Sequence, residues 1–222
     1  MRFIVNDTPL DLDPAHLIIA GWTGRDAAAI QHHIDELAEL GVKPPSTTPL
    51  FYRVSAGLLT TGDSIQVVGN ASSGEVEPMI LQSGGQRWLG LGSDHTDRAL
   101  EAHSVAMSKQ VCAKPCAARL WPWEDVADRL EDIRLESWIE EDGEWVVYQQ
   151  GTLASIRPLG ELIDGGSLDA LSRDGAVAMM CGTFGAIGGV RPATRFRMTM
   201  TDPARDRSIS HEYSMVQLPE IA

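Results

Sequence analysis

Three acidic residues, Glu75, Glu77 and Asp94, occur in a stretch of the sequence whose pattern predicts β-strands. At 75–77 the glutamates alternate with a valine, so on a strand both carboxylates point to the same face. An apolar segment, a glycine turn and a second short strand around residues 88–91 lead to Asp94. If this hairpin closes, Asp94 lies beside the strand end that carries both glutamates.

Three converging carboxylates without a cysteine ligand suit a hard divalent cation such as Mg²⁺ or Mn²⁺ better than a structural zinc. The alternative is that Glu75 and Glu77 form the solvated face of an edge strand, where alternating charge is ordinary. The spacing alone leaves both interpretations open.

A second candidate group lies on a predicted helix over residues 27–40, with Asp26 as N-cap. His33 and Glu36 are three residues apart and share a helix face. A carboxylate that accepts the imidazole N–H would orient the ring and support it as a general base. A solvated polar helix face explains the same spacing.

The glycine-rich segment 181–189 follows a predicted buried strand and offers backbone N–H groups together with the hydroxyl of Thr183. It predicts either a loop that holds a carboxylate or a plain structural turn. It is not a dinucleotide fingerprint, because no helical pattern follows it. A serine hydrolase has no support, since no Gly-x-Ser-x-Gly occurs.

Most of the predicted strands are joined by hairpins, which favours an antiparallel or mixed α+β fold, mainly β, over a doubly wound one. We expect strands at 2–5, 17–21, 50–54, 64–68, 176–180, 196–202 and 208–216, a hairpin over 134–160 with its tip at Asp142-Gly143, and helices at 97–107, 121–133 and 160–172.

The chain has 222 residues and a formal net charge of −13. No basic stripe interrupts this charge, so nucleic acid and anionic membranes are poor partners. No signal peptide or membrane span is predicted, and we expect a cytoplasmic protein. The three cysteines cannot all pair, and we expect them to be reduced and packed as small apolar side chains.

Taken in order, these segments resemble the fumarylacetoacetate hydrolase superfamily from about residue 24 onward. The family carries a Gly-Arg segment followed by a His–Glu pair, a Pro-x-Leu-Phe-x-Lys strand, Glu-x-Glu on a strand, an Asn-Asp-Val-Ser-Ala-Arg-Asp segment, a lysine, and a Thr-Gly-Thr loop. The matching stretches here are Gly24-Arg25 with His33 and Glu36, residues 49–53, residues 75–77, residues 93–98, Lys109 and residues 181–188.

The resemblance implies that Glu75, Glu77 and Asp94 bind Mg²⁺ or Mn²⁺, with Ca²⁺ able to replace it in crystals. It also implies that His33 and Glu36 activate water, that Lys109 is a catalytic residue which helps to hold the substrate, and that Arg25, Arg53 and Thr183 bind substrate. His33 lies three residues later than the family's histidine would, and Arg53 replaces the usual lysine. Because the arginine fork favours a carboxylate, this exchange points to an unusual substrate.

We therefore expect one domain over 1–222, with N-terminal strands and a lid helix at 1–48 and a β-roll core at 49–222. The implied fold is a mixed β-roll of antiparallel sheets with short peripheral helices, from an uncharacterised bacterial branch of the superfamily and assembled as a homodimer.

The implied function is metal-dependent hydrolysis of a C–C bond in a small 2-oxo or 2,4-dioxo acid through a metal-bound enolate. A decarboxylase, hydratase or isomerase on a 2-keto acid, a non-catalytic keto-acid-binding protein, and a structural β-protein without metal remain alternatives.

Overall fold

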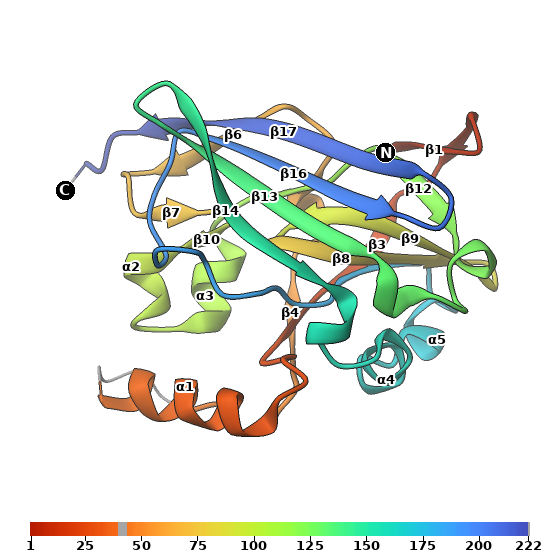
Figure 1. Cartoon of the computed structure of the whole chain (residues 1–222), viewed down its shortest axis with the longest axis horizontal. Helices are drawn as coiled ribbons and strands as arrows, with labels where there is room; N and C mark the ends of the chain where they lie inside the picture. The colour runs from red at the N-terminus through yellow and green to blue at the C-terminus, as the bar shows by residue number, and fades with distance from the viewer. Residues whose placement is uncertain (40–43, 222) are drawn as a thin grey trace.

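The computed structural model describes residues 1–39 and 44–221, without the side chains of His33, Glu36, Leu37 and Glu39. Two curled sheets lie over one another, and the short helices lie at the periphery (Figure 1). The expected α+β fold, mainly β, is confirmed.

The larger sheet has eight strands in the order β2-β1-β12-β9-β8-β15-β3-β4. Two of its neighbouring pairs, β1 with β12 and β15 with β3, are parallel, and β8 and β9 form its central hairpin. The strands are β1 (Arg2–Val5), β2 (Thr8–Asp11), β3 (Pro14–Gly21), β4 (Leu50–Val54), β8 (Val76–Ser83), β9 (Gln86–Ser93), β12 (Arg119–Pro122) and β15 (Ala176–Met180).

The second sheet has five strands in the order β14-β13-β16-β17-β6, of which β17 and β6 are parallel. Two short pairs, β10 with β7 and β11 with β5, complete the strands that the described residues form. The bounds are β5 (Leu59–Thr60), β6 (Ser64–Val68), β7 (Ser72–Ser73), β10 (Thr96–Asp97), β11 (Lys114–Pro115), β13 (Arg134–Glu141), β14 (Glu144–Thr152), β16 (Arg195–Asp202) and β17 (Arg207–Leu218).

The main hydrophobic core lies between the two sheets. Along β16 every second residue is buried, which directs Met198 and Met200 into the core. They join the same cluster as Ile80 of β8 and Val177 of β15. Residues of the opposite parity, such as Met79, form a second cluster on the other face of the larger sheet. Both faces of its central strands are therefore buried, which explains their nearly continuous apolar sequence.

The α-helices are α1 (Ala27–Glu39), α2 (Arg98–Glu101), α3 (Val105–Gln110), α4 (Leu159–Gly165) and α5 (Leu168–Leu171). Four 3₁₀ turns are also present: η1 (Ala56–Leu58), η2 (Trp123–Asp125), η3 (Leu130–Asp132) and η4 (Leu153–Ser155). Asp26 caps α1 as predicted, because its Oδ1 accepts hydrogen bonds from the N–H groups of Ala28 and Ala29 at 2.9 and 3.1 Å.

The predicted helix over 121–133 is wrong: the segment contains the end of β12 and two 3₁₀ turns. Its apolar spacing suits a helix, but the Arg129 guanidinium bonds to Asp202 of the second sheet at 3.1 Å. The backbone around Arg129 forms short turns that allow this contact, in place of continuous α-helical hydrogen bonds. The predicted helix over 97–107 is divided into α2 and α3, since Ser104 starts a new helix as an N-cap.

The predicted strands and the 134–160 hairpin are confirmed, with β1, β4, β6 and β15 at the expected bounds. Asp142 and Gly143 at the hairpin tip have φ values of 51° and 84°, as a two-residue hairpin turn requires.

Candidate metal and substrate site

The β8–β9 hairpin brings the three predicted carboxylates together. Val76 pairs with Ser93, and the Asp94 N–H donates to the Glu75 carbonyl at 3.1 Å. One ligand atom each from Glu75, Glu77 and Asp94 lies within 4.8 Å of the other two. The convergence expected from the hairpin is present.

Glu77 is the more deeply buried of the two glutamates, with an exposed fraction of 2%. Its Oε2 accepts a hydrogen bond from the Gly182 N–H at 2.7 Å. Burial, followed by the negative charges of Asp94 and Glu75, raises the pKa of the Glu77 carboxyl well above its usual range. A buried acid beside two other acids needs positive charge nearby to be ionised at neutral pH.

Two lysines contact the fully buried Asp94. Lys109 of α3 donates to Oδ2, and the Lys114 Nζ lies 3.0 Å from Oδ1 and donates to the His95 carbonyl. Burial alone would raise the pKa of the Asp94 carboxyl, but Lys109 and Lys114 outweigh burial and lower this pKa to about 2. Asp94 is therefore ionised across the physiological range.

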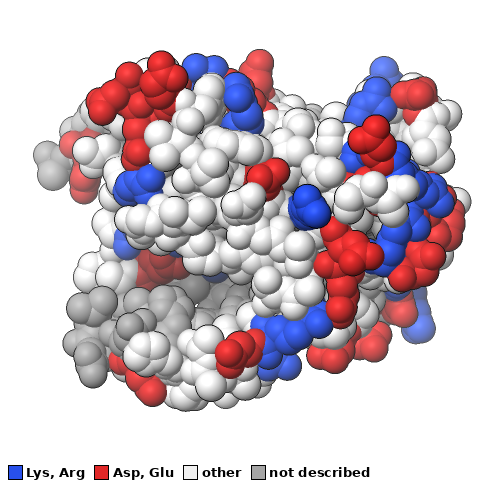
Figure 2. All heavy atoms as spheres, viewed as in Figure 1, with Lys and Arg blue, Asp and Glu red and all other residues white. Residues whose placement is uncertain are grey.

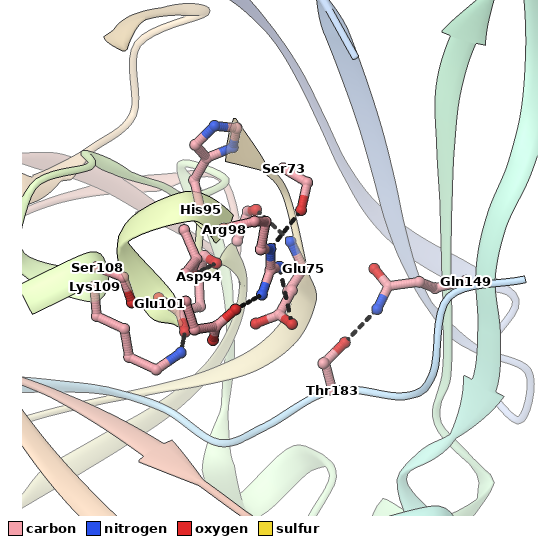
Figure 3. A network of polar contacts seen from close by, with 12 residues as sticks. Ser73, Glu75, Asp94, His95, Arg98, Glu101, Ser108, Lys109, Gln149 and Thr183 are labelled. Carbon is pink, nitrogen blue, oxygen red and sulfur yellow. Dashed lines mark hydrogen bonds and ion pairs between the residues drawn. The ribbon is translucent and has the colours of Figure 1, made fainter. Parts of the chain in front are cut away.

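Glu75 pairs with Arg98 at the start of α2, at 3.0 Å between Oε1 and Nη2 (Figure 3). The same guanidinium donates to Glu101 at 2.8 Å and to the Ser73 hydroxyl at 2.7 Å. Arg98 is thus fixed on three sides and holds Glu75 at the edge of the carboxylate group.

Thr183 lies across the site from α2 and α3 (Figure 3). Its hydroxyl donates to the Val76 carbonyl and accepts from the Gln149 Nε2, both at 2.7 Å. Gln149 also accepts from the Val76 N–H at 2.9 Å. These contacts fasten the glycine-rich segment to β8, so that the Gly182 N–H stays directed at Glu77.

A buried polar network supports the loop after β9. The His95 ring contacts the Tyr213 hydroxyl at 3.0 Å and the Ser72 hydroxyl at 2.9 Å. The Tyr213 hydroxyl also contacts the Ser93 Oγ at 2.8 Å. Burial, followed by the charges of Lys114 and Arg98, lowers the pKa of His95 to about 3, so His95 is a neutral structural residue.

The structure places two predicted substrate residues away from this group. Arg25 pairs with Glu131 at 2.8 Å and lines a separate cavity of about 460 Å³. Arg53 of β4 is exposed, and its Nη2 contacts His16 at 3.1 Å. The side chains of His33 and Glu36 on α1 lie outside the described residues, so the dyad stays a prediction.

Sequence reasoning missed two side chains of the site. Tyr52 precedes Arg53 on β4 and has its ring 6.0 Å from the Lys109 ammonium. Alternation along β4 places these neighbours on opposite faces, but it does not tell which face is directed at the carboxylates. No sequence pattern marks Lys114 as a site residue, because its burial depends on the fold around Asp94.

The three carboxylates together fit a hard divalent cation. All three side chains offer oxygen ligands, two of them are buried, and the raised pKa of Glu77 reflects negative charge that a cation would offset. In the space-filling view the surface is hollowed between the α1 side and the body of the protein, and acidic atoms are visible at the hollow (Figure 2).

The fold is shared with solved structures described as fumarylacetoacetate isomerase/hydrolase proteins. The chain belongs to the family DUF2848, described as proteins of unknown function, which matches residues 20–213. No curated protein matches the chain.

Three solved structures illustrate the fold. A protein from Oleispira antarctica assigned as a fumarylacetoacetate isomerase/hydrolase is 17% identical, with a TM-score of 0.67, and 97% of this chain and 100% of that chain are covered. A 2-keto-3-deoxy-D-arabinonate dehydratase complexed with magnesium and 2,5-dioxopentanoate is 13% identical, with a TM-score of 0.65 and coverage of 94% and 75%. An Escherichia coli protein assigned as an isomerase is 14% identical, with a TM-score of 0.61 and coverage of 96% and 98%.

No helix in the described part of the chain is long and apolar enough to cross a membrane.

Proposed function

We propose that this protein is a metal-dependent enzyme that hydrolyses a C–C bond of a small 2-oxo or 2,4-dioxo acid, as an acylpyruvate hydrolase would. The observation that carries the proposal is the convergence of Glu75, Glu77 and Asp94 within 4.8 Å, next to a buried lysine. The likeness to a dehydratase that binds magnesium and a dioxo acid supports it.

Glu75, Glu77 and Asp94 would hold the cation, with Mg²⁺ or Mn²⁺ as the proposed metal. When bound, the cation would supply Lewis-acid stabilisation of the negative charge that develops on a 2-oxo acid. Arg98 would keep Glu75 in place, and the Gly182 N–H would do the same for Glu77.

Lys109 would attract the substrate carboxylate, which the net charge of −13 would otherwise repel. Burial alone would lower the pKa of the Lys109 ammonium, but Asp94 and then Glu75 outweigh burial and raise this pKa, so Lys109 stays charged at neutral pH. Thr183 would border the substrate from the opposite side.

The His33 and Glu36 pair on α1 would take a proton from water and direct the water at the second carbonyl. The helix would act as a lid that closes over bound substrate. Arg25 and Arg53 would contact substrate only if their side chains turn toward the site, because both guanidinium groups lie elsewhere in the structure.

A dehydratase or isomerase acting on a sugar-derived 2-keto acid is the second candidate. It is favoured by the dehydratase among the similar structures and by the exchange at Arg53. Both reactions would use the same carboxylate group. The homodimer stays a prediction, which light scattering of the purified protein would test.

The experiment is a substrate panel of acylpyruvates, oxaloacetate and sugar-derived 2-keto acids, assayed with Mg²⁺ and with Mn²⁺. Release of two carboxylic acids from an acylpyruvate is the expected result. Loss of water from a sugar acid would favour the second candidate. Tight binding of a keto acid without turnover of any compound would identify a binding protein and overturn the enzymatic proposal.

A further inference from the structure

We propose that the Tyr52 hydroxyl donates a hydrogen bond to an anionic oxygen of the substrate, and that Trp22 positions this hydroxyl. The inference rests on the proposed function, because it assumes a carboxylate or enolate-like ligand beside Lys109. It adds a neutral hydrogen-bond donor beside the charged Lys109.

Tyr52 faces the site because of its place on β4. It pairs with Ile19 of β3, and it packs against the same apolar cluster as Met79, two residues beyond Glu77 on β8. Tyr52 and Glu77 therefore lie on the same face of the larger sheet. The Tyr52 ring also lies 6.0 Å from the Lys109 ammonium, within the range of a cation–π contact.

The hydrogen bond from Trp22 determines which role the Tyr52 hydroxyl can play. The indole Nε1 donates to the Tyr52 hydroxyl at 3.2 Å. Since an indole N–H is only a donor, the phenol oxygen accepts here and keeps its own proton for another partner. Among the described residues, no acceptor takes this proton. A ligand oxygen beside Lys109 would supply the acceptor.

The backbone near Trp22 accommodates the hydrogen-bonded pair of Trp22 and Tyr52. Trp22 has a φ of 60°, in the left-handed region that a bulky residue rarely adopts. A Cβ on the preceding Gly21 would lie 2.9 Å from the Tyr52 ring, so a larger residue at 21 would push the ring aside. A left-handed φ at a residue other than glycine persists only where the surrounding structure determines it, and such residues are common at ligand sites.

The Tyr52 phenol stays protonated at neutral pH, because burial raises its pKa above the ordinary tyrosine value. It can therefore donate to negative oxygen without taking up charge itself. A donor of this kind would discriminate between substrates that place an oxygen at this position and analogues that lack it.

The test uses oxalate, a small dicarboxylate with the shape of an enolised 2-oxo acid, titrated calorimetrically in saturating magnesium chloride. Tyr52→Phe keeps the ring and its contact with Lys109 but removes the hydroxyl. We expect it to bind oxalate about 10-fold more weakly, the size of a lost hydrogen bond to a charged group. Its Mg²⁺ affinity and Tm should match those of the wild type. Tyr148→Phe, which removes a hydroxyl outside the site, is the matched control and should bind oxalate normally.

Trp22→Phe tests the positioning role. We expect it to weaken oxalate binding by about 3-fold, and to have no further effect when Tyr52 is already phenylalanine. Full oxalate affinity of Tyr52→Phe would overturn the inference, and so would a loss of oxalate affinity together with Tm and Mg²⁺ affinity, since that would show a structural tyrosine. Failure of the wild type itself to bind oxalate would instead count against the proposed function.

Discussion

At the scale of the residue, Asp94 forms ion pairs with two lysines, and we expect these lysines to have different roles. Lys109 is 6% exposed and has the Tyr52 ring beside its ammonium, whereas Lys114 has no exposed surface and also donates to the His95 carbonyl. Lys109 is placed to meet a ligand, and Lys114 is placed to hold the loop after β9.

Exchange of either lysine for methionine breaks a buried ion pair with Asp94, and Lys109→Met should in addition remove a ligand contact. Lys109→Met should weaken binding of a keto acid by roughly 10-fold or more, because it removes a charge-assisted contact to the carboxylate. Lys114→Met should mainly lower the free energy of unfolding, by about 3 to 5 kcal/mol, since breaking a buried ion pair leaves Asp94 with less compensation. Ligand titration and urea unfolding of both variants measure this. Equal ligand affinity in wild type and Lys109→Met would show that Lys109 only balances Asp94.

Some residues of the candidate site could be predicted from the sequence, and others could not. Glu75, Glu77 and Asp94 could be predicted to converge because a hairpin register and a period of two are local properties. Tyr52 and Lys114 could not be predicted, since the side that β4 presents and the burial of a lysine depend on distant parts of the chain.

At the scale of the element, the glycine-rich segment after β15 depends on Gly182. Gly182 has a φ of 99°, and a Cβ there would lie 1.6 Å from the Thr23 hydroxyl oxygen. Gly182→Ala should therefore lower the free energy of unfolding by roughly 3 kcal/mol or more, from backbone strain and steric overlap. It should also weaken metal binding, because the Gly182 N–H moves away from Glu77. Gly185→Ala, where a Cβ would meet open space, is the control and should behave like the wild type in both measurements.

The helix α1 carries His33, the predicted general base. His33→Ala should lower turnover by about 10²-fold or more and leave metal affinity intact, as expected for loss of a general base. Steady-state kinetics and metal titration measure the two effects. An unchanged turnover number would remove His33 from the mechanism and leave either His32 or a water activated by the cation as the base.

Elements with a local signal were predictable and those that depend on tertiary contacts were not. The cap at Asp26, the turn at Asp142-Gly143 and the alternation of β16 all lie within a few residues of sequence. The segment 121–133 has helical spacing but folds as short turns, because Arg129 reaches Asp202, which lies 73 residues away along the chain.

At the scale of the whole molecule, Asp202 connects parts of the chain that are distant in sequence. Its carboxylate has no exposed surface and accepts from Arg129 and Arg207, both at 3.1 Å. Burial opposes ionisation, but the two arginines outweigh it and lower the pKa of Asp202. The stabilisation is therefore present above the ordinary aspartate pKa of about 3.9 and is lost as the pH falls through the lower folded-state value.

Asp202→Asn should consequently cost about 3 kcal/mol of unfolding free energy at neutral pH. The difference from wild type should shrink as the pH falls below about 4. Denaturant unfolding at a series of pH values measures this difference. A difference that stays constant down to the acid limit would mean that the variant acts through packing and not through the ion pairs.

We infer that Glu75, Glu77 and Asp94 form one cation site, and titration of the purified protein with Mn²⁺ measures whether they do. The wild type should bind one ion per chain at this site. Glu77→Gln should bind it at least roughly 10²-fold more weakly with an unchanged or higher Tm, because the amide keeps the shape of the buried acid and removes its repulsion with Asp94. Glu124→Gln, at an exposed glutamate of η2, should bind like the wild type. Absence of binding by the wild type, or equal binding by Glu77→Gln, would contradict the claim.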